Sequence, residues 1–298
     1  MAQNTYPKRK SPPPKRQPVK KAATVKPNKK AALKRFVVTT AIAAIIAVII
    51  VIAVLMFTGL RYYKNSNNEG TTVKFFGWVD DSGAYEKGSL YYSGKIDGKA
   101  ELVAEENKII FANGDVYVGE IVSGFPSGTG AMTYANGDVY EGAFTGGMRN
   151  GTGKMTYKTG DIYEGAFDKD AITGEGSFTW PDGSNYTGTF KDGKKNGHGF
   201  YKFSDGSAFE GTYENDMKTG KGKYAFANGD VYEGEFKDDL FNGDGVYTWA
   251  NGEVYTGAFE NNKIHGNGTY SWPSGRVLVG YFENGEFVRT TVTKTNGK

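Results

Sequence analysis

Residues suited to catalysis or metal binding are few in this chain, and their spacing keeps them apart. Cysteine is absent and there are two histidines, His198 and His265. Thiolate metal sites, thiol nucleophiles and disulfides are therefore excluded. The histidines fall near the turn side of two units of a regular repeat, which are separated by roughly 29 Å at about 4.8 Å per strand. A metal ion or a catalytic dyad cannot span that distance, so both are predicted to be surface residues.

Two loops resemble ligand-binding motifs only in part. The glycine-rich run from Gly147 to Lys154 has the wrong glycine spacing for a phosphate-binding loop, and Met155 follows the lysine where Ser or Thr is needed. The triplet 168–170, Asp-Lys-Asp, opens like a calcium loop but lacks the third acid and the terminal glutamate of that motif. We therefore predict no catalytic residue, no cofactor and no metal site, and conclude that the protein is not an enzyme.

Carboxylates recur at one position of the repeat. They form a row that could bind cations, although a solvated polar face is the simpler interpretation. Residues 111–288 hold 14 basic and 25 acidic side chains, so this region repels nucleic acid, and no nucleic-acid partner is predicted. The recurring carboxylates are Glu141, Glu164, Glu210 and Glu233.

A repeat of 23 residues organises these positions. Each unit opens on a large side chain, followed two residues later by glycine and four residues later by a ring or Ile, which is the period-2 pattern of a strand. The second half of the unit reads Gly-x-Gly-x-aromatic-x-aromatic and predicts a second strand. The opening residues are Tyr117, Tyr140, Tyr163, Tyr186, Phe209, Tyr232, Tyr255 and the degenerate Leu278.

Tight turns are predicted between units, at pairs such as Asn136-Gly137, because Asn-Gly supplies the positive φ values that two-residue hairpins need. The three prolines of the array, Pro126, Pro181 and Pro273, are expected in connections, since proline cannot donate a ladder hydrogen bond. The pattern places Tyr140, Gly142, Phe144 and Met155 on one face and polar residues on the other. We predict that rings lie over glycines, so that stacked hairpins need no second sheet.

The motif Tyr-Glu-Gly-x-Phe, followed by Gly-x-Gly-x-Met/Tyr-x-Tyr/Trp and Asn-Gly-Asp at period 23, resembles the membrane occupation and recognition nexus (MORN) repeat over residues 111–288. An irregular further copy begins at Tyr92, which sets the predicted array at 92–288, before a C-terminal tail at 289–298. The resemblance implies an all-β, elongated, single-layer antiparallel meander of stacked hairpins. It implies contacts with proteins or membranes, or homo-oligomer formation, and no catalytic residue.

The N-terminal region differs from the array in composition. Residues 1–35 contain twelve Lys or Arg, six Pro and no acid, and are predicted to be a disordered tail. Residues 36–60 carry no charged side chain and would reach about 37 Å as a helix, enough to cross a hydrocarbon core of about 30 Å. We predict one transmembrane helix there, acting as an uncleaved signal anchor rather than a cleavable signal peptide. Residues 61–91 are assigned to a juxtamembrane linker.

The basic tail predicts a cytoplasmic N-terminus and an array outside the cell or in a lumen, by the positive-inside rule. The predicted function is a non-enzymatic scaffold, anchored in the cell membrane by a single pass, that mediates protein–protein or membrane-surface contacts. The alternative is a carbohydrate or cell-wall binding module displayed on the cell surface, since exposed rings also stack on sugars. A Gly77-Trp78 pair near Tyr85 and Tyr91-Tyr92 weakly resembles wall-binding repeats.

Overall fold

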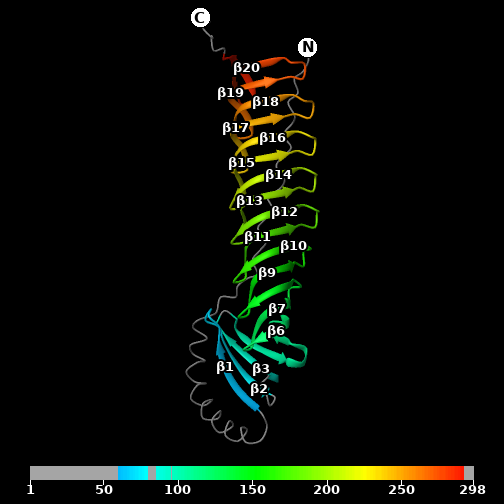
Figure 1. Cartoon of the computed structure of the whole chain (residues 1–298), viewed down its shortest axis with the longest axis vertical. Coiled ribbons are helices and arrows are strands. Elements are labelled where there is room, and N and C mark those ends of the chain that lie inside the picture. The colour runs from blue at the N-terminus through cyan, green and yellow to red at the C-terminus, as the bar shows by residue number, and fades with distance from the viewer. Residues whose placement is uncertain (1–59, 80–84, 95, 292–298) are drawn as a thin grey trace. The chain divides into compact units, whose positions relative to one another are not determined.

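The computed structural model describes residues 60–79, 85–94 and 96–291. The chain divides into two compact units, 1–57 and 58–298, and all described residues belong to the second. They form one antiparallel sheet of 21 strands. Each strand pairs with the next along the chain, from β1–β2 through the repeats to β20–β21, so the sheet is a meander. Figure 1 shows the hairpins of the repeats stacked in sequence order.

The predicted basic tail and nearly all of the predicted transmembrane segment lie outside the described residues. Among the residues that are described, no helix combines the length and the apolar composition needed to cross a membrane.

Residues 61–91 are not a linker, because they supply three strands of the sheet. The reason is a strict alternation in which Val73 and Phe75 are buried while Lys74 and Phe76 are exposed, as expected for a strand with one face in a core. The sequence hides this alternation because some exposed positions are also apolar. The elements before the repeats are β1 (Leu60–Ser66), β2 (Thr72–Val79), β3 (Tyr85–Ser93), β4 (Gly98–Val103), the 3-10 turn η1 (Ala104–Glu106) and β5 (Lys108–Phe111).

The regular repeats each contribute one strand of seven residues and one of nine until the last unit, which confirms the two strands expected per unit. The last strand ends two residues beyond the predicted limit of the array. These strands are β6 (Val116–Val122), β7 (Phe125–Thr133), β8 (Val139–Thr145), β9 (Met148–Thr156), β10 (Ile162–Asp168), β11 (Ala171–Thr179), β12 (Asn185–Lys191), β13 (Lys194–Lys202), β14 (Ala208–Glu214), β15 (Met217–Ala225), β16 (Val231–Lys237), β17 (Leu240–Thr248), β18 (Val254–Glu260), β19 (Lys263–Ser271), β20 (Val277–Glu283) and β21 (Glu286–Thr290).

The two-residue turns lie within the repeats, not between them as expected. Lys169 and Asp170, which join β10 to β11, have φ values of 48° and 71°, the pair of positive values found in type I′ hairpin turns. Asp and Asn tolerate this conformation better than most residues. The connections between units are longer, and in each the glycine alone has a positive φ, as at Gly137 (94°). Pro126 also differs from expectation, because it is the second residue of β7.

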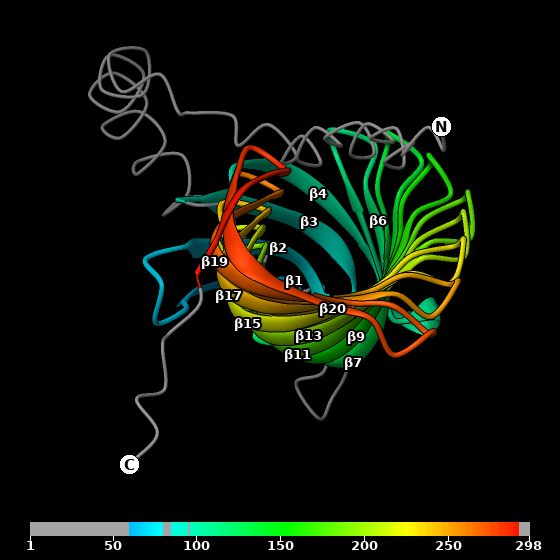
Figure 2. The ribbon, with the colours of Figure 1, turned by 90° about the horizontal axis from the view of Figure 1, so that it is seen from above.

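A bulge in each hairpin curves the sheet. In β8–β9, Gly142 pairs with Gly153 whereas Phe144 pairs with Arg149, so three residues of β9 lie opposite a single residue of β8. The bulge includes Gly151, whose φ of 99° is unfavourable for other residues. Bulges bend strands and increase their twist. Figure 2 shows the result, with the strands of the repeats curved around a shared concave face.

The core lies on one face of the sheet, and its rings lie over glycines as predicted. Tyr140 is 0% exposed. A Cβ added at Gly142 would lie 2.5 Å from the Tyr140 hydroxyl oxygen, and one added at Gly153 would collide with the same ring. The Tyr140 hydroxyl donates to the Ala143 carbonyl at 3.0 Å. Each ring thus closes over its own hairpin.

Edge-to-face contacts join the hairpins into one core. The Tyr140 ring centroid lies 5.0 Å from that of Phe144 in its own repeat and 5.0 Å from that of Phe167 in the next. The alternation continues to Phe282, which lies 5.3 Å from Tyr255. Because these pairs are close to perpendicular, the positive ring edge meets the negative ring face. A single sheet can therefore bury a continuous core.

Candidate interaction surface

A second row of rings is only partly buried. These residues follow the last residue of the second strand in each repeat, where the chain turns toward the next unit. The Trp249 N–H donates to the Glu253 carbonyl, and the Gly252 N–H donates to the Trp249 carbonyl, both at 2.9 Å, which fixes the backbone beneath the ring. We name this set the outer aromatic row; its members are Tyr134, Tyr157, Trp180, Phe203, Phe226, Trp249 and Trp272.

The outer aromatic row is stacked along the array. Trp249 lies 4.7 Å from Tyr247 in its own repeat and 5.1 Å from Tyr270 in the next, with ring planes inclined by 50° and 36°. Comparable contacts continue without a gap from Phe178 to Trp272. Ring neighbours on both sides leave Trp180, Phe203, Phe226 and Trp249 little rotamer freedom, so these four present half-buried rings of fixed orientation.

Polar contacts between consecutive units support the row. The Tyr247 hydroxyl donates to Asp230 Oδ2 at 2.8 Å, and the Tyr270 hydroxyl donates to Glu253 Oε2 at 2.6 Å. Asp230 is 4% exposed and also accepts the Ala250 N–H at 2.8 Å. Burial, followed by the hydrogen bond to Asp230, raises the pKa of Tyr247 well above its usual value. Tyr247 is therefore a protonated donor, and both hydroxyl hydrogen bonds join one repeat to the next.

Three cations lie among the core rings, at equivalent positions of their repeats. Arg149 and Lys218 pair with carboxylates of the next unit, Asp170 at 3.1 Å and Asp239 at 3.2 Å. The third cation, Lys195, is described next. Sequence reasoning missed this set, because Lys or Arg in a polar-looking strand is normally expected on the solvent side. The sequence signal that could have revealed them is that each of the three cations lies nine residues after the opening ring of its repeat.

Lys195 differs from the other two cations in its surroundings. Its amine lies 4.9 Å from the ring centroids of Tyr201 and Tyr213 and 5.7 Å from that of Tyr186, a cation–π arrangement. Burial lowers the pKa of Lys195 to about 8, although the nearby negative charge of Asp216 acts to raise it. The neighbouring Tyr213 hydroxyl is buried and has no hydrogen-bond partner among the described residues.

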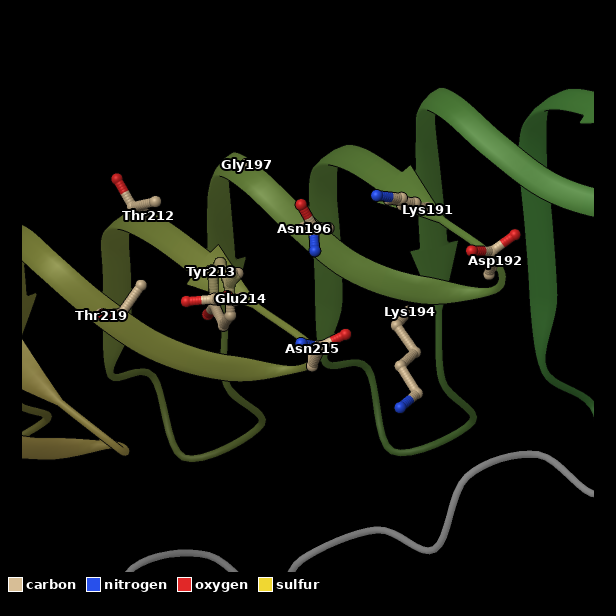
Figure 3. A pocket seen from close by; sticks show the side chains of 10 residues that line it. All are labelled: Lys191, Asp192, Lys194, Asn196, Gly197, Thr212, Tyr213, Glu214, Asn215 and Thr219. Atoms are coloured by element: carbon tan, nitrogen blue, oxygen red, sulfur yellow. The ribbon is translucent and has the colours of Figure 1, made fainter.

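A polar hollow of about 580 Å³ lies beside these residues, between the hairpins β12–β13 and β14–β15. Figure 3 shows its lining, in which Lys191, Asp192, Lys194 and Asn215 come from the two-residue turns or the residues next to them. Its lining includes both lysines and acids, and no member of the outer aromatic row. The hollow therefore offers no grouping of residues that would select a ligand.

The residues considered for chemistry from the sequence are dispersed. His198 lies in β13, opposite Thr212, and His265 lies in β19, 3.5 Å from Glu260, so both are in strands and not at turns. In the recurring carboxylate row, Glu141 and Glu164 both lie opposite Lys154, which is 2.9 Å from Glu164. Within the part of the chain that the structure describes, no three His, Asp or Glu side chains are grouped as a metal site requires.

The 23-residue unit matches a known family model, the MORN repeat, in seven consecutive stretches. Together they cover more than half of the chain. This protein belongs to the MORN repeat family. Strands β1–β5 lie before the first matched residue, so the irregular copy beginning at Tyr92 is not part of the match. The degenerate unit at Leu278 lies after the last matched residue. The matched stretches are residues 117–139, 140–162, 163–185, 186–208, 209–231, 232–254 and 255–275.

None of the curated proteins matches this MORN protein. Among solved structures, it is similar to the TCP10 domain of Danio rerio CPAP (E1021V mutant), with 15% identity, coverage of 78% of this chain and 99% of that chain, and a TM-score of 0.37. It is also similar to the Drosophila melanogaster SAS-4 (dCPAP) TCP domain, solved in complex with a proline-rich motif of Ana2 (dSTIL). That match has 14% identity, coverage of 58% and 86%, and a TM-score of 0.34. At these scores the likenesses carry no functional argument.

Proposed function

We propose that this MORN protein is a non-enzymatic scaffold, held at a membrane by residues 36–60, whose array binds a protein partner along the outer aromatic row. The observation that carries the proposal is that each of the seven matched repeats places one half-buried ring in this row. The first six of these rings pack against the core while part of each stays exposed. Rigid aromatic side chains are the residues most enriched at the energetic centres of protein interfaces. They lose little conformational entropy on binding, because neighbouring rings already hold them.

The anchor is supported by the sequence. Residues 36–60 form an uncharged, strongly apolar stretch of 25 residues, and twelve basic residues precede it. This arrangement orients the N-terminus toward the cytoplasm and the array away from it. The array then reaches its partner outside the cytoplasm. Formation of a homo-oligomer through the array remains a prediction.

Site-specific photocrosslinking tests partner binding. A photoreactive residue at position 249 should give a protein adduct in native membranes, whereas the same residue at exposed Thr256 of β18 should not. Replacement of Trp272 by Ser, one repeat away in the row, should lower the yield of the adduct from position 249, while Val277→Ser should leave it unchanged. Equal yields from positions 249 and 256 would contradict the proposal. Retention of the array on wall polysaccharide, lost in Trp272→Ser, would favour the carbohydrate alternative instead.

Extraction tests the anchor separately. The full chain should stay with membranes in high salt and at alkaline pH, and protease added to intact cells should remove the array but spare the basic tail. A mature chain that begins near Arg61 would mean that the apolar segment is a cleaved signal.

A further inference from the structure

The sheet formed by β1–β4, before the repeats, has an outer face that is unlike the outer face of the array. Its buried side carries Val73, Phe75 and Leu90. Its exposed side carries four rings where strands of a one-sided sheet normally present polar residues. Their exposed fractions are 53% for Tyr62, 44% for Phe76, 41% for Trp78 and 45% for Tyr91.

The strand register makes these rings one patch. Tyr62 lies directly opposite Phe76, and Trp78 is two residues further along β2 on the same side. Tyr91 lies opposite Lys74, which is two residues before Phe76. Opposite residues on one face have Cβ atoms about 5 Å apart and diagonal neighbours about 7 to 8 Å apart, so Tyr62 is adjacent to Phe76 and Tyr91 is its diagonal neighbour. Exposed contiguous apolar patches of this kind mark surfaces for partners or membranes.

Lysines surround the rings on the same face. Lys64 lies opposite Lys74, Lys87 opposite Trp78, and Lys99 opposite Tyr91, and the Lys87 amine lies 5.5 Å from the Trp78 ring centroid. Two acids lie near these lysines: Glu101, opposite Ser89, and exposed Glu86, in the bulge of β3 next to Lys87. The face is therefore basic in a protein whose residues after position 35 include 33 acids and 24 basic side chains. We name it the aromatic–lysine face.

We propose that the aromatic–lysine face lies on the surface of a lipid bilayer and binds anionic headgroups. Tyr and Trp favour the membrane interface because the ring is apolar and the polar edge stays hydrated, and lysines extend past such rings toward lipid phosphates. The position in the chain agrees, since β1 starts at Leu60, the last residue of the apolar segment. In this respect the inference rests on the anchor of the proposed function.

The face is fixed relative to the repeats. In the turn between β1 and β2, the Asn67 side-chain amide donates to the Gly146 carbonyl at 2.7 Å, and Glu69 pairs with Lys169 at 2.9 Å. Both partners lie in the turns of the second and third regular hairpins. Contact of the aromatic–lysine face with a bilayer would therefore set the angle at which the array leaves the membrane.

The test uses fragment 58–298, since all described strands and core residues lie within it. Flotation with vesicles of roughly three parts phosphatidylcholine to one part phosphatidylglycerol should show binding, while pure phosphatidylcholine should bind much less. Phe76→Thr with Trp78→Thr should weaken binding about tenfold or more, because those rings lose contact with the bilayer. The matched control is Val277→Thr with Val279→Thr, two exposed valines of β20, which should leave binding unchanged.

Charge is tested with Lys74→Gln and Lys87→Gln, which should reduce binding, against Lys221→Gln and Lys223→Gln on the outer face of β15. Raising the salt from about 0.1 M to about 0.5 M should also release the fragment. The inference fails if the fragment does not float with the anionic vesicles, or if the β2 double variant and the β20 control lose binding equally. It also fails if Phe76 and Trp78 are needed for a dimer of the fragment and that dimer does not bind vesicles. Release of the full chain by alkaline extraction would reject the anchor alone, because vesicle binding by the fragment does not depend on residues 36–57.

Discussion

Replacement of Gly142 by Val tests whether rings over glycines hold the array together. A Cβ at this position would lie 2.5 Å from both the Tyr140 hydroxyl oxygen and the Gly153 α-carbon, and 2.7 Å from the Thr152 carbonyl oxygen. Overpacking of this kind costs about 1 to 3 kcal/mol. Two edge-to-face contacts of Tyr140 are worth about 1 kcal/mol each, and its hydrogen bond about 1 kcal/mol. If the ring is expelled, the cost is therefore about 4 to 6 kcal/mol, although Val has the higher strand propensity.

Urea unfolding of fragment 58–298 measures this cost, with hydrogen exchange to show whether the damage stays near one repeat, as nearest-neighbour coupling predicts. The control is Thr156→Val on the outer face of β9, opposite Val139 and Ile162, which should be neutral or mildly stabilising. In a Tyr140→Ala background, Gly142→Val should cost only about 1 to 2 kcal/mol, because backbone contacts alone oppose it. A Gly142→Val fragment as stable as the parent, or one whose cost is unchanged without the Tyr140 ring, would refute the reasoning.

The remaining predictions concern the polar groups of the array. Lys195→Met should stabilise the fragment at pH 7 by roughly 1 to 3 kcal/mol. Burial lowers the pKa of Lys195 to about 8, so above that pH the folded parent binds fewer protons than its unfolded chain and becomes more stable as the pH rises. The stability difference between Lys195→Met and the parent should therefore shrink toward pH 10 in urea titrations. Asp230→Ala should cost about 2 to 4 kcal/mol. Asp138 accepts the Lys158 N–H but is only partly buried, so Asp138→Ala should cost about 1 kcal/mol. Above pH 10 the fragment should lose stability in circular dichroism melts, since burial raises the pKa of Tyr117 to about 12 and the unfolded chain releases its phenolic protons first.

The regular part of the fold was predictable because one 23-residue pattern sets strand, face and packing together. The positions of Tyr140, Gly142 and Phe144 implied a ring over a glycine, and the structure places them so. The bulge at Gly151 was not predicted, because parity counting assumes that paired strands advance at equal rates. The location of the two-residue turns was missed for a related reason. Pairs such as Asn261-Asn262, with φ values of 52° and 66°, lack the glycine that was used as the turn signal.

The surfaces were harder to predict than the core, because alternation reveals a buried face only when the other face is polar. In β8 the exposed Glu141 between Tyr140 and Gly142 marks the outward side. In β2 the outward residues include Phe76 and Trp78, so the pattern reads as irregular and the strand was assigned to a linker. Once the structure is known, the apolar residues on the outward face of β2 indicate a binding surface. A sheet whose core is already complete has no packing use for further rings, so rings on its other face are available to a partner or a membrane.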